Sequence, residues 1–172
     1  RFFIEREVKM TDKPFLIDSH CHLDRLDLIP FDGSLDAALN EARANGVGHM
    51  LCVCIDLEHF DDVINIARAN KDVSASVGVH PNDEVEHEPT ADILIALAND
   101  PDVVAIGETG LDYFRSEGDL EWQRDRFRQH ITAAKGCKKP LIIQTREARE
   151  DTIKIMQEEK AAEIGGVMHC FT

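Results

Sequence analysis

No apolar run in the 172-residue sequence approaches the roughly 20 residues that a membrane-spanning helix needs. The first ten residues mix charges with Phe2 and Phe3, and they lack the apolar core and the small-residue cleavage site of a signal peptide. We expect the natural start at Met10 and a disordered N-terminal extension at residues 1–14. Residues 15–172 are then expected to form one domain.

Cysteine pairs and nucleotide-binding loops are also missing. None of the five cysteines belongs to a Cys-x-x-Cys pair, and Cys52 and Cys54 fall in an apolar segment. This usage indicates buried free thiols and a cytoplasmic protein. Because the sequence contains neither a Gly-x-Gly-x-x-Gly motif nor a P-loop, we expect no nucleotide cofactor.

Positive charge is scarce. The chain has 19 Lys and Arg against 33 Asp and Glu, a formal net charge of −14. Such a balance argues against a protein that coats nucleic acid through bulk electrostatics. It still allows an enzyme that holds a phosphodiester locally, because bound metal ions supply positive charge where it is needed.

Segments of strand type alternate with segments of helix type along the chain. The expected strands are Phe15–His22, His49–Ile55, Val73–His80, Val103–Gly107, Pro140–Thr145 and Gly165–Cys170. The expected helices are Leu35–Asn45, Leu57–Asn70, Ala91–Asn99, Asp119–Lys135 (closed by Gly136) and Arg149–Glu159. Short, continuously apolar strands that alternate with helices predict parallel βαβ units and an α/β fold.

Polar side chains of ligand type stand at the carboxyl ends of five of these six strands. They are His20 and His22, His80, Glu108, the group Gln144, Thr145 and Arg146, and His169. The carboxyl ends of parallel strands lie on one rim, where α/β barrels and open α/β sheets build their sites. The shared position therefore indicates a functional site, although a lone His-x-His pair is often just two surface histidines.

The residue types on this rim suit a metal site. His20 and His22 point to the same side of a strand, roughly 7 Å apart, and with Glu108 they form a plausible first site for Zn or Mn. Glu108 could bridge to a second ion roughly 3.5–4 Å away, for which His169 is the clearest ligand. We expect Asp18 to orient one imidazole through a hydrogen bond.

Other polar residues have less certain roles. His80 could be a ligand, a proton donor, a substrate contact or a structural histidine, and Arg146 could hold a phosphate or pair with a carboxylate. His130 is expected at the surface or in partly buried packing of its helix. Arg124, Arg126 and Arg128 are expected to form a solvated helix face, and His49, His59 and His87 to have no functional role.

Four segments together resemble the ordered signatures of the TatD family of metal-dependent DNases. They are Asp18–Asp24 (DSHCHLD), Gly78–Pro81 (GVHP), Gly107–Tyr113 (GETGLDY) and Gly165–Phe171 (GGVMHCF). The resemblance implies a (β/α)₈ TIM barrel of the amidohydrolase type and hydrolysis of DNA, often as a 3′–5′ exonuclease. It also implies two divalent ions (Mg, Mn or Zn). We expect the protein to be a monomer.

The resemblance assigns roles to four of these residues. By this carry-over His20 and His22 bind the first ion, Glu108 bridges and takes part in catalysis, and His169 binds the second. We expect His80 and Arg146 to contact the substrate.

The sequence departs from the family in two ways. Gln144 stands in Gln144-Thr145-Arg146, where the family usually has a histidine that binds the second ion. Gln144 could bind this ion in its place, but an amide oxygen is a poorer ligand for Zn-like ions, so we expect a weakened second site. The sequence also ends after about six of eight strand–helix units, so the usual C-terminal aspartate is absent from it. Two other functions therefore stay open: hydrolysis of a small amide or ester, and metal binding without catalysis by a truncated chain.

Overall fold

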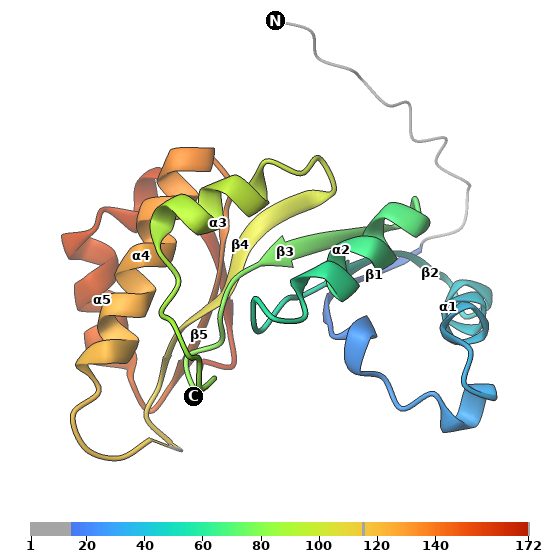
Figure 1. Ribbon diagram of the computed structural model, residues 1–172, viewed down its shortest axis with the longest axis horizontal. Helices are drawn as coiled ribbons and strands as arrows, with labels where there is room; N and C mark the ends of the chain where they lie inside the picture. Colours follow the sequence, from blue (N-terminus) through green and yellow to red (C-terminus); the bar gives the residue numbers. More distant parts are fainter. Residues whose placement is uncertain (1–14, 115, 172) are drawn as a thin grey trace, which may run out of the picture.

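The computed structural model describes residues 15–114 and 116–171, so the extension expected at 1–14 lies outside the described residues. Its six strands form one parallel sheet in the order β1-β2-β3-β4-β5-β6. The sheet curls, and the helices alternate with its strands (Figure 1). The expected fold class is confirmed: the chain is an incomplete (β/α) barrel.

Most elements lie within a few residues of the predicted bounds. The strands are β1 (Leu16–Cys21), β2 (Val47–Cys52), β3 (Val73–Val77), β4 (Val103–Asp112), β5 (Leu141–Arg146) and β6 (Gly166–His169). The helices are α1 (Leu35–Ala44), α2 (Phe60–Ala69), α3 (Ala91–Ala98), α4 (Glu121–Cys137) and α5 (Arg149–Glu158). The described part of the chain includes no helix with the length and apolar character needed to cross a membrane.

β4 is twice as long as the sequence predicts. The glycine-rich segment after Ile106 suggests a turn, yet the strand continues to Asp112 and stays paired with β5. Gly107 and Gly110 have φ angles of 146° and 118°, which side chains disfavour. A Cβ atom on Gly110 would lie 2.1 Å from the Gln144 carbonyl oxygen, so glycine here permits close strand contact.

We expect Gly110→Ala to lower the free energy of unfolding by about 2 kcal/mol, because it adds both a backbone clash and a strained φ. Urea unfolding measures this loss. Gly118→Ala is the matched control, since Gly118 also has a positive φ of 85° but no atom within 4 Å of the added Cβ. Equal losses in the two variants would contradict the close-contact explanation.

α4 does not end at Gly136 as predicted. The helix continues to Cys137 and is terminated by Lys138, which adopts the left-handed conformation at φ 59°. A Cβ atom on Gly136 would lie 2.6 Å from the Ile95 side chain of α3. The glycine thus allows α3 and α4 to pack closely and is not a helix stop.

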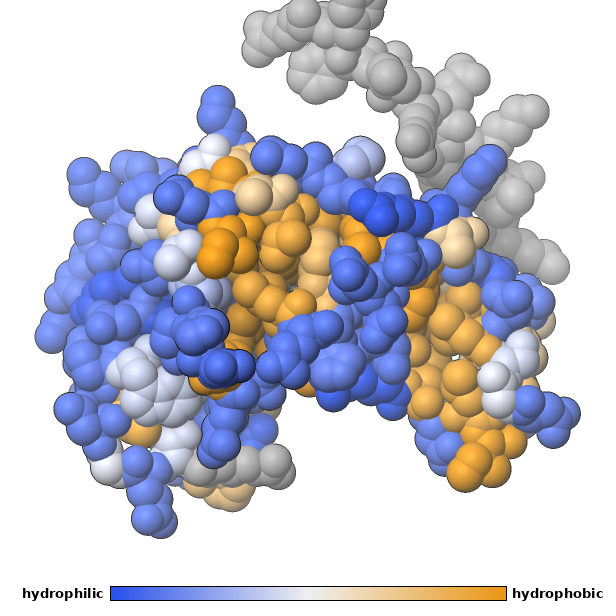
Figure 2. All heavy atoms as spheres, in the orientation of Figure 1, coloured by the Kyte–Doolittle hydropathy of each residue, from blue (hydrophilic) through white to orange (hydrophobic). Residues whose placement is uncertain are grey.

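β1 and β6 are the two edges of the sheet, and among the described strands each pairs on one side only. Leu16 and Ile17 of β1 are 66% and 61% exposed, and Val167 of β6 is 60% exposed. In the view of Figure 2, apolar side chains reach the surface in the middle of the molecule and near α1. Within residues 15–114 and 116–171, both edge strands therefore have exposed apolar side chains and one side without strand partners.

Candidate metal centre

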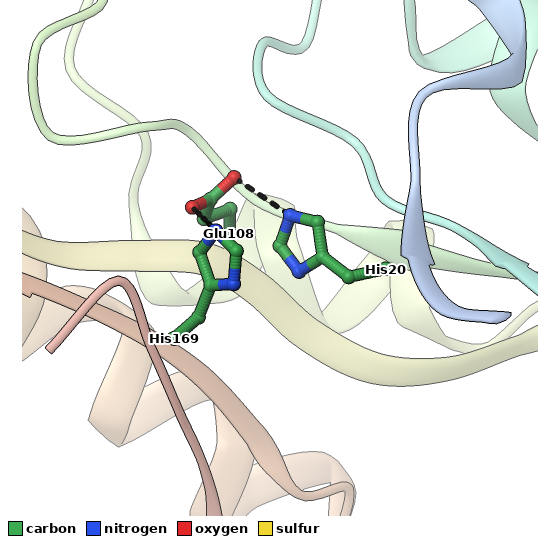
Figure 3. A group of neighbouring side chains, drawn as sticks. All are labelled: His20, Glu108 and His169. Carbon is green, nitrogen blue, oxygen red and sulfur yellow. Dashed lines mark ion pairs between the residues drawn. The ribbon is translucent and has the colours of Figure 1, made fainter.

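The carboxylate of Glu108 lies among three imidazoles brought together by both edge strands and β4. Its Oε2 atom is 3.3 Å from Nε2 of His20 and 4.0 Å from Nε2 of His22, and its Oε1 atom is 3.6 Å from Nε2 of His169. Figure 3 shows His20 and His169 converging on this carboxylate from opposite ends of the sheet. The rim predicted from the sequence therefore forms one compact cluster.

The donor set of the cluster fits a divalent metal. One ligand atom each from His20, Glu108 and His169 lie within 4.8 Å of one another. Two neutral imidazoles and a carboxylate are a common ligand set for Zn and Mn. Oε1 of Glu108 and Nε2 of His20 are buried without a hydrogen-bond partner among the described residues, which is costly unless an ion uses their lone pairs.

His22 is oriented for ligation by a backbone contact. Its Nδ1 atom lies 2.8 Å from the carbonyl oxygen of Val53, so Nδ1–H donates to that carbonyl. The proton on Nδ1 leaves the lone pair of Nε2 free, and Nε2 is the atom that faces Glu108.

Protonation states in the cluster also favour metal binding. Burial alone would raise the pKa of Glu108, but the close contact with His20 and the nearby imidazoles of His80 and His169 outweigh burial, so the pKa is below its usual value. The pKa of His169 is lowered by burial and by the adjacent His20. At neutral pH, the site thus holds an ionised carboxylate and a neutral His169, the forms that bind metals.

Next to the cluster lies a cavity of about 360 Å³ on the same rim. It is lined by His22, Ile55, His80, Asn82, Asp83, Glu108, Asp112, Gln144, Arg146 and His169. Both predicted substrate contacts, His80 and Arg146, therefore line one cavity beside the candidate metal site. His80 stands in the loop after β3, which ends at Val77 rather than at the predicted His80.

The structure shows the hydrogen-bond and ion-pair partners of two cavity residues, Arg146 and Gln144, which the sequence does not determine. Nε of Arg146 is 3.5 Å from Oδ2 of Asp112, so Arg146 has the carboxylate partner considered as its alternative role. Gln144 accepts a hydrogen bond from Nε2 of His80 at 3.0 Å and donates one to Asp112 at 2.6 Å. Asp112, fully buried, was not predicted as a site residue.

The expectation for Asp18 was wrong. Its carboxylate accepts a hydrogen bond from the backbone N–H of His20 at 3.2 Å, so it contacts the strand rather than an imidazole. Asp18 is exposed, and its short side chain reaches only the backbone two residues ahead.

Arg126 and His130 lie deeper than the sequence predicts: Arg126 is not on a solvated helix face, and His130 is neither at the surface nor only partly buried. Arg126 is 2% exposed and donates to the carbonyl oxygens of His80 and Asp83 at 2.8 and 2.9 Å, while both Glu88 oxygens accept at 2.7 Å. The fully buried His130 accepts from the backbone N–H of Val79 at 3.0 Å. The two residues hold the loop that carries His80.

The helical spacing of Arg126 and His130 predicts that both face the sheet. Arg126 and His130 are four residues apart, directly before Phe127 and Ile131, which are buried on the same side of α4. The four positions form one stripe toward the sheet. The residue types alone do not reveal this buried stripe, because arginine is rarely buried and Arg126 is buried only with partners such as Glu88.

Three comparisons place the chain among known proteins. Residues 17–172 match the family described as TatD related DNase. The chain is 40% identical over 158 residues to the "Uncharacterized metal-dependent hydrolase YcfH" of Escherichia coli K12, which covers 92% of the chain and 59% of YcfH. It is 32% identical over 138 residues to the "3'-5' ssDNA/RNA exonuclease TatD" of Salmonella typhimurium, covering 80% of the chain and 53% of that protein.

The fold comparison agrees. The crystal structure of YJJV, a TatD homolog from Escherichia coli K12, matches with a TM-score of 0.76 and 28% identity over 91% of this chain and 60% of that chain. The chain spans about 60% of the length of the curated relatives it matches.

Proposed function

Because the chain belongs to the TatD related DNase family, we propose that the protein containing it is a metal-dependent hydrolase that removes nucleotides from the 3′ end of DNA. The observation that carries the proposal is the buried Glu108 carboxylate between His20, His22 and His169. The name of the Salmonella relative, a 3′-5′ ssDNA/RNA exonuclease, supports the choice of substrate.

The residues of the cluster have distinct roles in this proposal. His20 and His22 would hold a first divalent ion, His169 a second, and Glu108 would bridge them. Such ions, when bound, polarise a phosphoryl oxygen and lower the pKa of a water molecule to near neutral. Their positive charge would also offset the repulsion between DNA and a chain of net charge −14.

The cavity residues would hold the phosphodiester. Nε of Arg146 faces Asp112, which leaves the two terminal nitrogens of its guanidinium for a phosphate oxygen. His80 lines the same cavity on the opposite side of Gln144. All five cysteines are free thiols, which supports a cytoplasmic location.

The test is nucleotide release from 3′-labelled single-stranded DNA by the complete polypeptide with Mg²⁺, Mn²⁺ or Zn²⁺. We expect release that requires a divalent ion and stops when EDTA removes it. No release with any of the three ions would overturn the proposal.

The acidic surface favours one other substrate class. A net charge of −14 suits a small uncharged molecule better than DNA, and the same ions would polarise a carbonyl oxygen equally well. Parallel assays with DNA and with small cyclic amides and esters separate the two functions. Metal binding without turnover of either substrate would identify a non-catalytic metal-binding protein.

A further inference from the structure

A continuous chain of polar contacts crosses the wall of the cavity from Arg146 to the loop after β3. Nε of Arg146 and the Gln144 amide nitrogen both face Oδ2 of Asp112, at 3.5 and 2.6 Å. Oε1 of Gln144 lies 3.0 Å from Nε2 of His80, and Nδ1 of His80 accepts from the backbone N–H of Asn82 at 3.1 Å. Gln144 is the central link of this chain and is itself buried.

The donor and acceptor roles in one hydrogen bond of this chain determine those in the next. The amide nitrogen of Gln144 donates to the Asp112 carboxyl group, so the amide oxygen faces His80 and can only accept. His80 must then donate through Nε2–H. Its Nδ1 atom already accepts from Asn82, so His80 is the neutral Nε2–H tautomer.

We propose that Gln144 is a positioning residue that does not bind a metal ion. Together with the backbone N–H of Asn82 it fixes the tautomer of His80. Through Asp112 it orients Arg146 in the substrate cavity. The proposal rests on the proposed function in that it assigns this cavity to substrate. His80 keeps no free lone pair, since both of its ring nitrogens are engaged. The metal-binding residues are then those around Glu108.

Gln144→Met tests the proposal, because methionine has nearly the same length and removes both hydrogen bonds. In ¹⁵N-edited NMR spectra of the imidazoles, we expect wild-type His80 to be the pure Nε2–H tautomer. In the variant only the backbone N–H of Asn82 still favours this tautomer, so the Nδ1–H tautomer should become detectable. A purely structural role would lower the stability and leave the tautomer unchanged, and that outcome would overturn the proposal.

Metal titration supplies the second readout. Zn²⁺ should shift the ring signals of His20, His22 and His169 and leave the Gln144 side-chain amide signals in place. Zn²⁺ affinity, measured by calorimetry, should change less than threefold in Gln144→Met. A tenfold or greater loss of affinity, or a shift of the Gln144 amide signals by Zn²⁺, would show that Gln144 is a ligand.

Gln129→Met is the matched control. Gln129 accepts a hydrogen bond from the backbone N–H of Ala91, so the same chemical change occurs away from the cavity. It should leave the His80 tautomer unchanged. These readouts need no turnover, so a failure of the DNA assay and a failure of this proposal are separate results.

Discussion

Glu108→Gln is expected to weaken the binding of Zn²⁺ or Mn²⁺ by at least about 100-fold, which corresponds to about 3 kcal/mol. Glu108 supplies the negative charge of the cluster, and its two oxygens face different histidines, His20 and His169. An amide keeps the shape but is neutral, and its NH₂ group has no lone pair to offer an ion. Calorimetric titration of the purified chain measures the loss.

Two comparisons make this result specific. Glu86→Gln applies the same change to an exposed glutamate and should leave metal affinity unchanged. Thermal unfolding in EDTA establishes that the Glu108 variant is folded before the titration is interpreted. Wild-type affinity in a folded Glu108→Gln variant would remove the basis of the proposed metal centre.

The second large effect is a loss of stability in acid that depends on His130. Burial lowers the pKa of His130 to about 4, whereas in the unfolded chain it titrates near 6.5. The contribution of neutral His130 to the free energy of unfolding is fully present above pH 6.5. It is lost as the pH falls toward 4, because the unfolded state then binds a proton that the folded state does not. The difference amounts to roughly 3 kcal/mol.

Urea unfolding at several pH values between 7 and 4 measures this loss. In His130→Gln, an amide oxygen can still accept from the backbone N–H of Val79, but the side chain no longer titrates. The variant should therefore lose less stability than wild type over this range. His87→Gln, at an exposed histidine, should behave like wild type, and equal slopes for all three proteins would contradict the role of His130.

The sequence alone predicts the candidate metal centre well because its residues depend on simple geometry. His20, Glu108 and His169 all stand at or near the carboxyl ends of parallel strands, and parallel strands bring those ends to one rim. The type and order of the elements follow from the same alternation of apolar strands and amphipathic helices. The cluster could thus be inferred without any side-chain coordinates.

Contacts between distant segments could not be predicted in this way. The continuation of β4 past Gly107 depends on how closely β5 approaches Gly110, and neither strand shows that alone. The burial of Arg126 depends on Glu88 and on loop carbonyls 43 and 46 residues away. The hydrogen bonds of Gln144 depend equally on Asp112, which lies in the GETGLDY segment but has no predictable partner from the sequence alone.

The open edges of the sheet give the candidate metal centre a mechanical role. His20 belongs to the first strand and His169 to the last, and these are the two strands that lack a second neighbour among the described residues. Ions held by these two histidines and bridged by Glu108 would connect the first and last strands of the curved sheet. Because residues so far apart in the sequence form the site only in the folded chain, metal binding should raise the free energy of unfolding.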